Sequence, residues 1–235
     1  SCSIRVGEWA WASALLDEWL ANETIGQFYL ELFVDRAVLT ALRGGDATED
    51  LDRAERLLPG TTDPQYTSYC HWARAWAGFT AGRLSEAQRE AEAAAQATNY
   101  FEPITLPLAA RAALWAGNAP GAAEIVDQMD RSVIKGQATE LDRVARRAGI
   151  AALEGRRADA ISGYREALRG WRGLGLAFDE ALTVVDLAAV LAPTEREMTE
   201  AQAVIEAARE TLRRLGARPL LARLDEATKA AVSSK

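Results

Sequence analysis

The chain has 235 residues, of which 49% are hydrophobic and 26% are charged, and its formal net charge at pH 7 is −7. It contains 48 Ala and 27 Leu, against 19 Val and Ile together. This balance favours helices over a β-sandwich, a barrel or a parallel sheet, because Ala and Leu propagate helices better than β-branched residues do. The negative charge argues against nucleic acid as a direct partner, since contacts to phosphates need a basic surface.

The scarcity of two residue types argues against the common metal and disulfide sites. His71 is the single histidine, so no pair of histidine ligands is available. Cys2 and Cys70 are too far apart for a zinc knuckle and too few for a disulfide framework. The sequence therefore predicts neither a metal site nor a cofactor.

The sequence also lacks the signals of a membrane or secreted protein. No apolar run approaches the roughly 20 residues of a membrane span, and residues 1–6 lack the apolar region and the cleavage site of a signal peptide. Sparse cysteines fit a reducing compartment. We therefore expect a cytoplasmic protein without a membrane partner. The first residue is not Met, which leaves open that the chain is a fragment of a longer protein.

Helical spacing begins near the N-terminus and continues through most of the chain. In residues 6–20, Trp9, Ala12 and Leu16 recur at intervals of three and four, which predicts an amphipathic helix. We expect this helix to pair with one that follows Thr24. No segment alternates with a period of two for long, so no strand is predicted.

Five breaks interrupt the helical patterns at a nearly constant distance. They are centred on Gly44, Gly82, Gly117, Gly155 and Pro193. The steps between them are 38, 35, 38 and 38 residues, a period that is typical of stacked helical hairpins. Glycine suits such a break because the residue after a helix often takes a left-handed conformation, which is least costly for glycine.

The helix after a break carries small and bulky residues in a fixed order. After Gly155, the sequence has Ala160, Tyr164 and Ala167, and after Gly82 it has alanine at the two corresponding outer places. This order resembles the tetratricopeptide repeat, in which small residues let paired helices approach and a bulky residue fills the space between hairpins. The hairpin at Gly117 departs from the order, because Met129 replaces the second alanine.

These patterns predict an all-α protein of twelve or thirteen helices. We expect about six tetratricopeptide-like hairpins in a right-handed superhelix, an α-solenoid, closed by a C-terminal capping helix over residues 220–232. The chain then forms a single helical repeat domain, residues 1–235. The alternative is a division into two domains near residues 132–137.

Two segments in the last third of the chain resemble a more specific group of proteins. They are FDEALTVVDLAAVLA (residues 178–192) and LRRLGARPLLARL (residues 212–224). They look like the C-terminal helical-repeat region of bacterial STAND-type signalling ATPases. The resemblance implies a nucleotide-binding module joined to such repeats and to an output module, often a nucleotide cyclase or a LuxR-type DNA-binding domain. It also implies that the repeats hold the ATPase inactive until an inducer or partner binds.

The resemblance covers the repeats alone. The chain contains no Gly-x-x-x-x-Gly-Lys-Ser/Thr loop and no basic helix-turn-helix after Pro219, so none of the catalytic residues of that group carry over. Cys70 and His71 are neighbours in a helix and point about 100° apart, so they do not form a nucleophilic pair. Adjacent carboxylates diverge in the same way. The sequence therefore predicts no catalytic residue.

One helix carries a stripe of aromatic residues that is the strongest candidate for a binding surface. Its members, spaced by 3, 3, 4 and 3, are Tyr66, Tyr69, Trp72, Trp76 and Phe79. With Arg74 nearby, the stripe would line the concave groove in which tetratricopeptide arrays bind peptides. The alternative is that it packs against neighbouring hairpins, as aromatic stripes at helical spacing usually do.

Other exposed or charged side chains leave similar alternatives open. Arg143 and Arg147 lie one turn apart, where like charges repel, so an acidic peptide or an Asp or Glu of this chain is expected to partner them. Trp9 and Trp11 cannot share one face of a helix, so at least one of them should be partly exposed.

The function that these features favour is a non-catalytic protein-interaction or sensor module that binds a peptide or protein. By resemblance, it would be the arm of a larger bacterial signalling ATPase or transcriptional regulator. The alternatives are a module that binds a small-molecule inducer and a free-standing oligomerisation scaffold, for which a homodimer is expected. An enzyme is disfavoured, because no convergent set of catalytic residues is visible.

Overall fold

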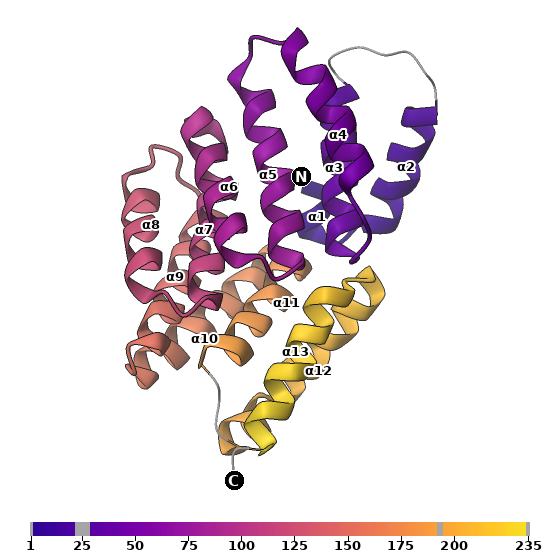
Figure 1. Cartoon of the computed structure of the whole chain (residues 1–235). Coiled ribbons are helices and arrows are strands. Elements are labelled where there is room, and N and C mark those ends of the chain that lie inside the picture. Colours follow the sequence, from indigo (N-terminus) through magenta and orange to yellow (C-terminus); the bar gives the residue numbers. More distant parts are fainter. Residues whose placement is uncertain (1, 22–28, 192–194, 234–235) are drawn as a thin grey trace.

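The chain folds into α-helices that pack against one another in order along the sequence (Figure 1). The computed structural model describes residues 2–21, 29–191 and 195–233, and these contain thirteen α-helices and no strand. The helices are α1 (Cys2–Val6), α2 (Trp9–Ala21), α3 (Tyr29–Leu42), α4 (Thr48–Leu57), α5 (Pro64–Thr80), α6 (Leu84–Ala97), α7 (Glu102–Trp115), α8 (Ala119–Arg131), α9 (Gln137–Leu153), α10 (Arg157–Leu174), α11 (Ala177–Asp186), α12 (Glu195–Leu215) and α13 (Arg218–Ser233). The prediction of an all-helical protein is confirmed for this part of the chain.

Three short helical turns join the longer helices. Two are 3₁₀ turns, η1 (Leu58–Gly60) and η2 (Asn99–Phe101), and the third is a π-helical turn, η3 (Leu187–Leu191), that continues α11. The chain between α8 and α9 lies at the place where the sequence allowed a domain boundary, but α8 and α9 pack against each other across it.

The four glycines at the predicted breaks have the expected backbone conformation. Gly44, Gly82, Gly117 and Gly155 have φ angles of 73°, 76°, 75° and 78°, in the left-handed region that other residues seldom adopt. The fifth break, at residues 192–194, and the predicted helix start after Thr24 lie outside the described residues.

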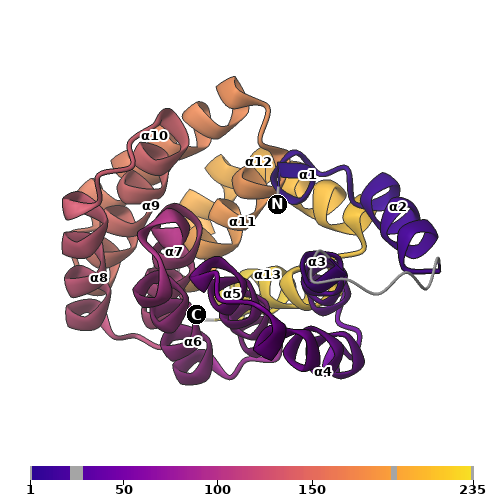
Figure 2. The ribbon, with the colours of Figure 1, turned by 90° about the horizontal axis from the view of Figure 1, so that it is seen from above.

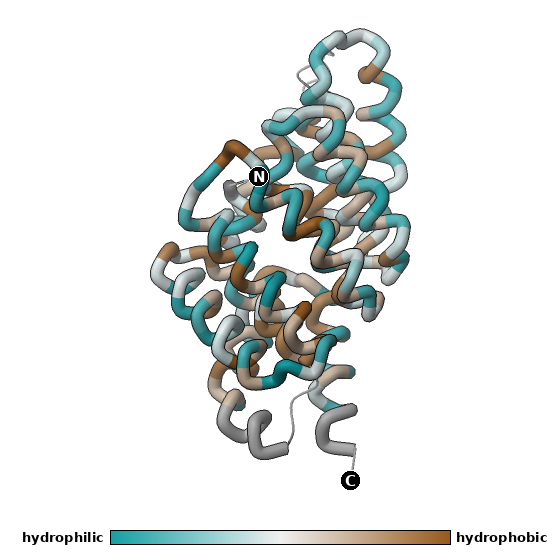
Figure 3. The backbone as a smooth tube through the Cα atoms, turned by 90° about the vertical axis from the view of Figure 1, so that its left-hand side faces the viewer, coloured by the Kyte–Doolittle hydropathy of each residue, from teal (hydrophilic) through white to brown (hydrophobic). Residues whose placement is uncertain are grey.

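Alanines of the second helices lie at the contacts between helices, as the repeat pattern predicts. Ala87 and Ala94 of α6 and Ala160 and Ala167 of α10 are fully buried. A Cβ atom added to Gly163 of α10 would lie 2.9 Å from the Cβ atom of Ala148 in α9. Small residues are therefore needed where α9 and α10 approach each other. Hydrophilic and hydrophobic residues are interspersed along many of the helices (Figure 3).

The last hairpin of the chain lies beside its first helices. Seen from above, the helices run round the molecule, and α12 and α13 lie beside α1 and α3 (Figure 2). The guanidinium of Arg218 donates to the carbonyl of Arg43 at 2.7 Å, and Gly44 lies against Pro219. The turn between α12 and α13 thus packs on the first helices (Figure 1).

The short helix α1 packs against α11, far away in the sequence. The rings of Trp9 and Phe178 meet edge to face with their centroids 5.0 Å apart, and the Trp9 indole donates to the carbonyl of Ile4 at 2.9 Å. These contacts hold α1 and the start of α2 against α11. No described helix combines the length and the apolar character needed to cross a membrane.

Candidate functional site

A pocket opens where α1, α5, α7, α9 and α11 come together. Its apolar wall includes Trp72 and Trp76 of α5 and Phe178 of α11. Its polar side chains are Arg5, Arg111, Asp142 and Asp179. The pocket holds about 510 Å³ of space, counting the solvent at its mouth. An aromatic wall beside a few fixed charged groups is the usual composition of a binding site.

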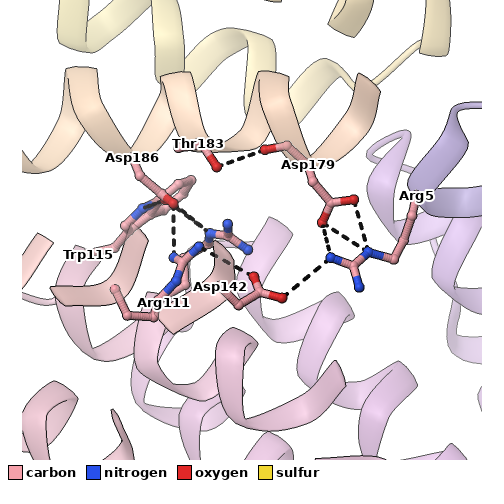
Figure 4. A network of polar contacts seen from close by, with 8 residues as sticks. Arg5, Arg111, Trp115, Asp142, Asp179, Thr183 and Asp186 are labelled. Atoms are coloured by element: carbon pink, nitrogen blue, oxygen red, sulfur yellow. Dashed lines mark hydrogen bonds and ion pairs between the residues drawn. The ribbon is translucent and has the colours of Figure 1, made fainter. Parts of the chain in front are cut away.

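Arg5 of α1 occupies the polar side of this pocket (Figure 4). Its Nε and Nη2 atoms donate to the two carboxylate oxygens of Asp179 at 3.0 and 2.9 Å. Nη2 also lies 3.4 Å from Asp142 of α9. The guanidinium carbon is 5.3 Å from the ring centroid of Trp171, within the range of a cation–π contact. Arg5 thus joins the N-terminal helix to α9, α10 and α11.

A second ion-pair centre lies deeper, around Asp186 at the end of α11. The carboxylate accepts from Nε of Arg111 at 3.0 Å, from Arg146 at 2.9 Å and from the indole of Trp115 at 2.8 Å. The Arg146 guanidinium also lies 4.0 Å from Asp142, which links the two centres. We call the six residues Arg5, Arg111, Arg146, Asp142, Asp179 and Asp186 the six-charge cluster.

The six-charge cluster is balanced, with three positive and three negative groups. Burial raises the pKa of Asp142, and the positive charge of Arg5 acts in the opposite direction and lowers it. Burial disfavours the charged form of Arg5, but Asp142 and Asp179 outweigh it and raise its pKa. Burial lowers the pKa of Arg111, and the neighbouring charge of Arg146 acts in the same direction. Each charge is therefore held in place by its partners inside the protein.

Only Arg5 of the cluster has substantial access to solvent. Its side chain is 23% exposed, whereas those of Asp179 and Asp186 are 12% and 1% exposed. The local sequence accounts for the placement of the acids on one face of α11, because Asp179, Thr183 and Asp186 are four and three residues apart. The Thr183 hydroxyl donates to the carbonyl of Asp179 at 2.8 Å within the helix.

The six-charge cluster was not predicted from the sequence, although the sequence contains a signal for it. Arg111 interrupts the apolar segment 104–115, and a charge in such a segment requires a buried partner. Asp142 and Arg146 are one turn apart on the buried face of α9. The partners could not be assigned from spacing, because Arg111 and Asp186 are 75 residues apart.

The aromatic stripe of α5 divides among different surroundings. Trp72 and Trp76 line the pocket, while Phe79 is buried behind them with its ring centroid 4.4 Å from that of Trp115. Tyr69 packs edge to face on Phe101, and Tyr66 is buried. The structure thus places two of the five aromatic residues at the pocket. The indole N–H of Trp76 is buried and finds no acceptor in the described part of the chain.

The three arginines predicted as candidate partner-binding residues, Arg74, Arg143 and Arg147, have partners within the chain. Arg74 pairs with Glu55 of α4. Arg143 is buried and donates to the carbonyl of Met129 at 2.6 Å, and Arg147 pairs with Asp130 at 2.7 Å. None of the three lies among the residues that line the pocket.

His71 and Cys70, which are neighbours on α5, have different surroundings. The His71 Nδ1 atom lies 2.8 Å from a carboxylate oxygen of Glu90. Burial raises the pKa of the Cys70 thiol to about 11, which leaves it protonated at neutral pH. In the described segments, no three His, Cys, Asp or Glu side chains are grouped closely enough to hold a metal ion.

The tryptophans of α2 behave as their spacing predicts. Trp9 is 1% exposed and Trp11 is 60% exposed, so the expectation that they face different surroundings is confirmed. Trp19 is also exposed. These two exposed indoles lie outside the pocket.

Comparisons with protein-family models, with curated proteins and with solved structures found no match to this chain. The resemblance to the repeat region of STAND-type ATPases therefore stays a prediction from the sequence, and the geometry of the pocket is the basis of the functional argument.

Proposed function

We propose that this chain is a non-catalytic binding module that takes a segment of a protein or peptide into the pocket between α1, α5, α7, α9 and α11. The observation that supports the proposal is the meeting of Trp72, Trp76 and Phe178 with the carboxylates of Asp142 and Asp179. Aromatic side chains in a partly enclosed pocket supply most of the binding energy in such sites, and fixed charges orient the ligand.

The proposal includes the finer architecture that the sequence predicts. It treats the array as a right-handed superhelix of about six tetratricopeptide-like hairpins, with α13 as the cap. The left-handed glycines and the buried alanines of α6 and α10 support this description. In such an array the pocket lies on the inner face, where the first helices of successive hairpins, such as α5 and α7, contact each other.

The wider setting of the module rests on the sequence resemblance. We propose that it is the arm of a larger cytoplasmic signalling ATPase or transcriptional regulator in a bacterium, and that ligand binding to the arm controls the attached module. A P-loop encoded in frame upstream of this chain would support the proposal. A complete coding sequence without such a motif would contradict it.

A small-molecule inducer is the second candidate ligand. The apolar wall beside a few fixed charged groups favours it, since this composition is typical of pockets for small ligands. A peptide is preferred because the apolar wall continues to the pocket mouth through Ile104, a half-buried residue of α7 that an extended ligand can reach.

The experiment is a selection of random 12-residue peptides on the full chain, followed by calorimetric titration of the selected peptides. Ile104→Ala should weaken binding at least about fivefold, because about 1 kcal/mol of apolar contact is removed. Ile161→Ala is the matched control, since Ile161 of α10 is half-buried and lies away from the pocket. Equal affinity of all three proteins, or a loss in the control alone, would contradict the proposed site.

A further inference from the structure

Arg5 is bound as a ligand would be bound, although it belongs to the chain. Its guanidinium makes a two-pronged contact with Asp179, a third contact with Asp142, and a stacking contact with the buried ring of Trp171. A planar, forked cation satisfies all of these contacts together, whereas the ammonium of a lysine has neither the fork nor the plane. The surroundings of Arg5 are therefore specific for a guanidinium group.

The charge balance of the cluster requires a cation at this place. Without Arg5, the buried groups are the guanidinium ions of Arg111 and Arg146 and the carboxylates of Asp142, Asp179 and Asp186, with one negative charge in excess. With Arg5 in place, the side chain of Asp142 is only 6% exposed, so its charge is compensated by groups of the protein and not by water. Whenever α1 leaves, another cation is favoured beside Asp142 and Asp179.

The helix that carries Arg5 is short and packs mainly against α11. α1 has five residues, and α2 follows it after Gly7, which has a φ angle of 87°. Besides Arg5, α1 is held by the buried side chain of Ile4, which also lines the pocket, and by the hydrogen bond from the Trp9 indole to the carbonyl of Ile4. The pocket continues beside Arg5 along Trp72 and Trp76, so a longer ligand has an apolar surface next to the carboxylates.

We propose that Asp142 and Asp179 form a guanidinium-binding site which α1 occupies with Arg5, and that an arginine of the partner peptide takes this place when the module binds. The α1 helix is then an internal competitor that keeps the site closed. This inference rests on the proposed function, since it identifies the chemistry of the partner and the regulation of the same pocket.

The first arm of the test asks whether the site binds a free guanidinium group. Arg5→Ala removes the equivalent of one ethylguanidinium ion, and should lower the melting temperature of the full chain by roughly 5 °C. Ethylguanidinium chloride at about 20 mM should restore a substantial part of this loss in Arg5→Ala and leave the wild type unchanged. N-ethylurea, which has a similar shape without the charge, should not restore it.

Two control variants complete this arm. Arg74→Ala removes a guanidinium from the surface pair with Glu55 and should not respond to ethylguanidinium. The double variant Arg5→Ala, Asp179→Asn should not be stabilised by ethylguanidinium, because the carboxylate that accepts both guanidinium hydrogen bonds is absent. Equal responses of Arg5→Ala and Arg74→Ala, or none in either, would overturn the guanidinium site.

The second arm asks whether α1 competes with a partner. Random 12-residue peptides selected on Arg5→Ala should be enriched in arginine, and they should bind the wild type at least tenfold more weakly than the variant. Selected peptides without arginine, or with equal affinity for both proteins, would overturn the competition. The first arm uses no peptide, so its failure bears on the guanidinium site alone. The Ile104→Ala test uses peptides selected on the wild type, so its failure bears on the proposed function.

Discussion

Asp186 is the residue whose neutralisation tests the six-charge cluster most severely. Asp186→Asn keeps the size of the side chain and one carbonyl oxygen, but it removes the charge that faces Arg111 and Arg146. The side chains of these arginines are 6% and 0% exposed. Two of the Arg146 nitrogen atoms, Nε and Nη2, already lack a hydrogen-bond partner in the described structure. The variant therefore leaves an uncompensated positive charge in the interior.

The expected loss of stability follows from this burial. Removing one partner of a buried ion pair typically costs about 3–5 kcal/mol, because the remaining charge stays without compensation. The indole of Trp115 can still donate to the side-chain oxygen of the introduced amide, so the loss of this hydrogen bond does not add to the expected loss of stability. For a chain of this length, a loss of this size corresponds to roughly 10 °C in melting temperature.

Urea unfolding followed by far-ultraviolet circular dichroism at pH 7 measures this loss as a free energy of unfolding. Asp52→Asn is the matched control, because Asp52 is exposed and its substitution should change stability by less than about 0.5 kcal/mol. Arg146→Met combined with Asp186→Asn should cost less than the sum of the single variants, since the two residues interact directly. A loss below about 1 kcal/mol for Asp186→Asn would refute the reasoning.

Further predictions concern a thiol and two glycines. In a Cys2→Ser background, the buried Cys70, whose pKa is about 11, should react with a disulfide reagent at pH 8 roughly a hundredfold more slowly than in the urea-unfolded chain; similar rates would contradict its burial. Gly163→Ala should destabilise the protein by about 1–3 kcal/mol, because the new Cβ atom would lie 2.9 Å from that of Ala148. Gly173→Ala in the same helix should instead stabilise it by about 0.5 kcal/mol, since nothing lies within 4 Å of the added atom; unfolding curves that give the two variants the same sign would contradict the packing of α9 on α10.

The local features of the fold could be predicted from the sequence because they depend on short-range spacing. The period of the glycines locates the helix ends at Gly44, Gly82, Gly117 and Gly155, and the left-handed φ angles agree with it. The places of Ala87 and Ala160 after their glycines identify where helices approach closely, and both are buried. A helix face and its end are properties of a few neighbouring residues.

The pocket could be predicted only in part, because it depends on contacts between distant segments. Helical spacing places Trp72 and Trp76 on one face of α5, but it does not show that this face meets Phe178. Arg5 and Asp179 are 174 residues apart, and no local pattern connects them. For Arg143 and Arg147, the sequence left open a partner peptide or partners within the chain, and the structure shows acceptors within the chain.

Fluorine NMR of the chain labelled with 5-fluorotryptophan tests the central claim most directly, because the seven tryptophans report on different surfaces of the molecule. When a selected peptide is added, the account predicts that the resonances of Trp72 and Trp76 shift, while those of the exposed Trp11 and Trp19 stay in place. Shifts confined to Trp11 and Trp19 would show that the ligand binds α2, and would contradict a binding site in the pocket.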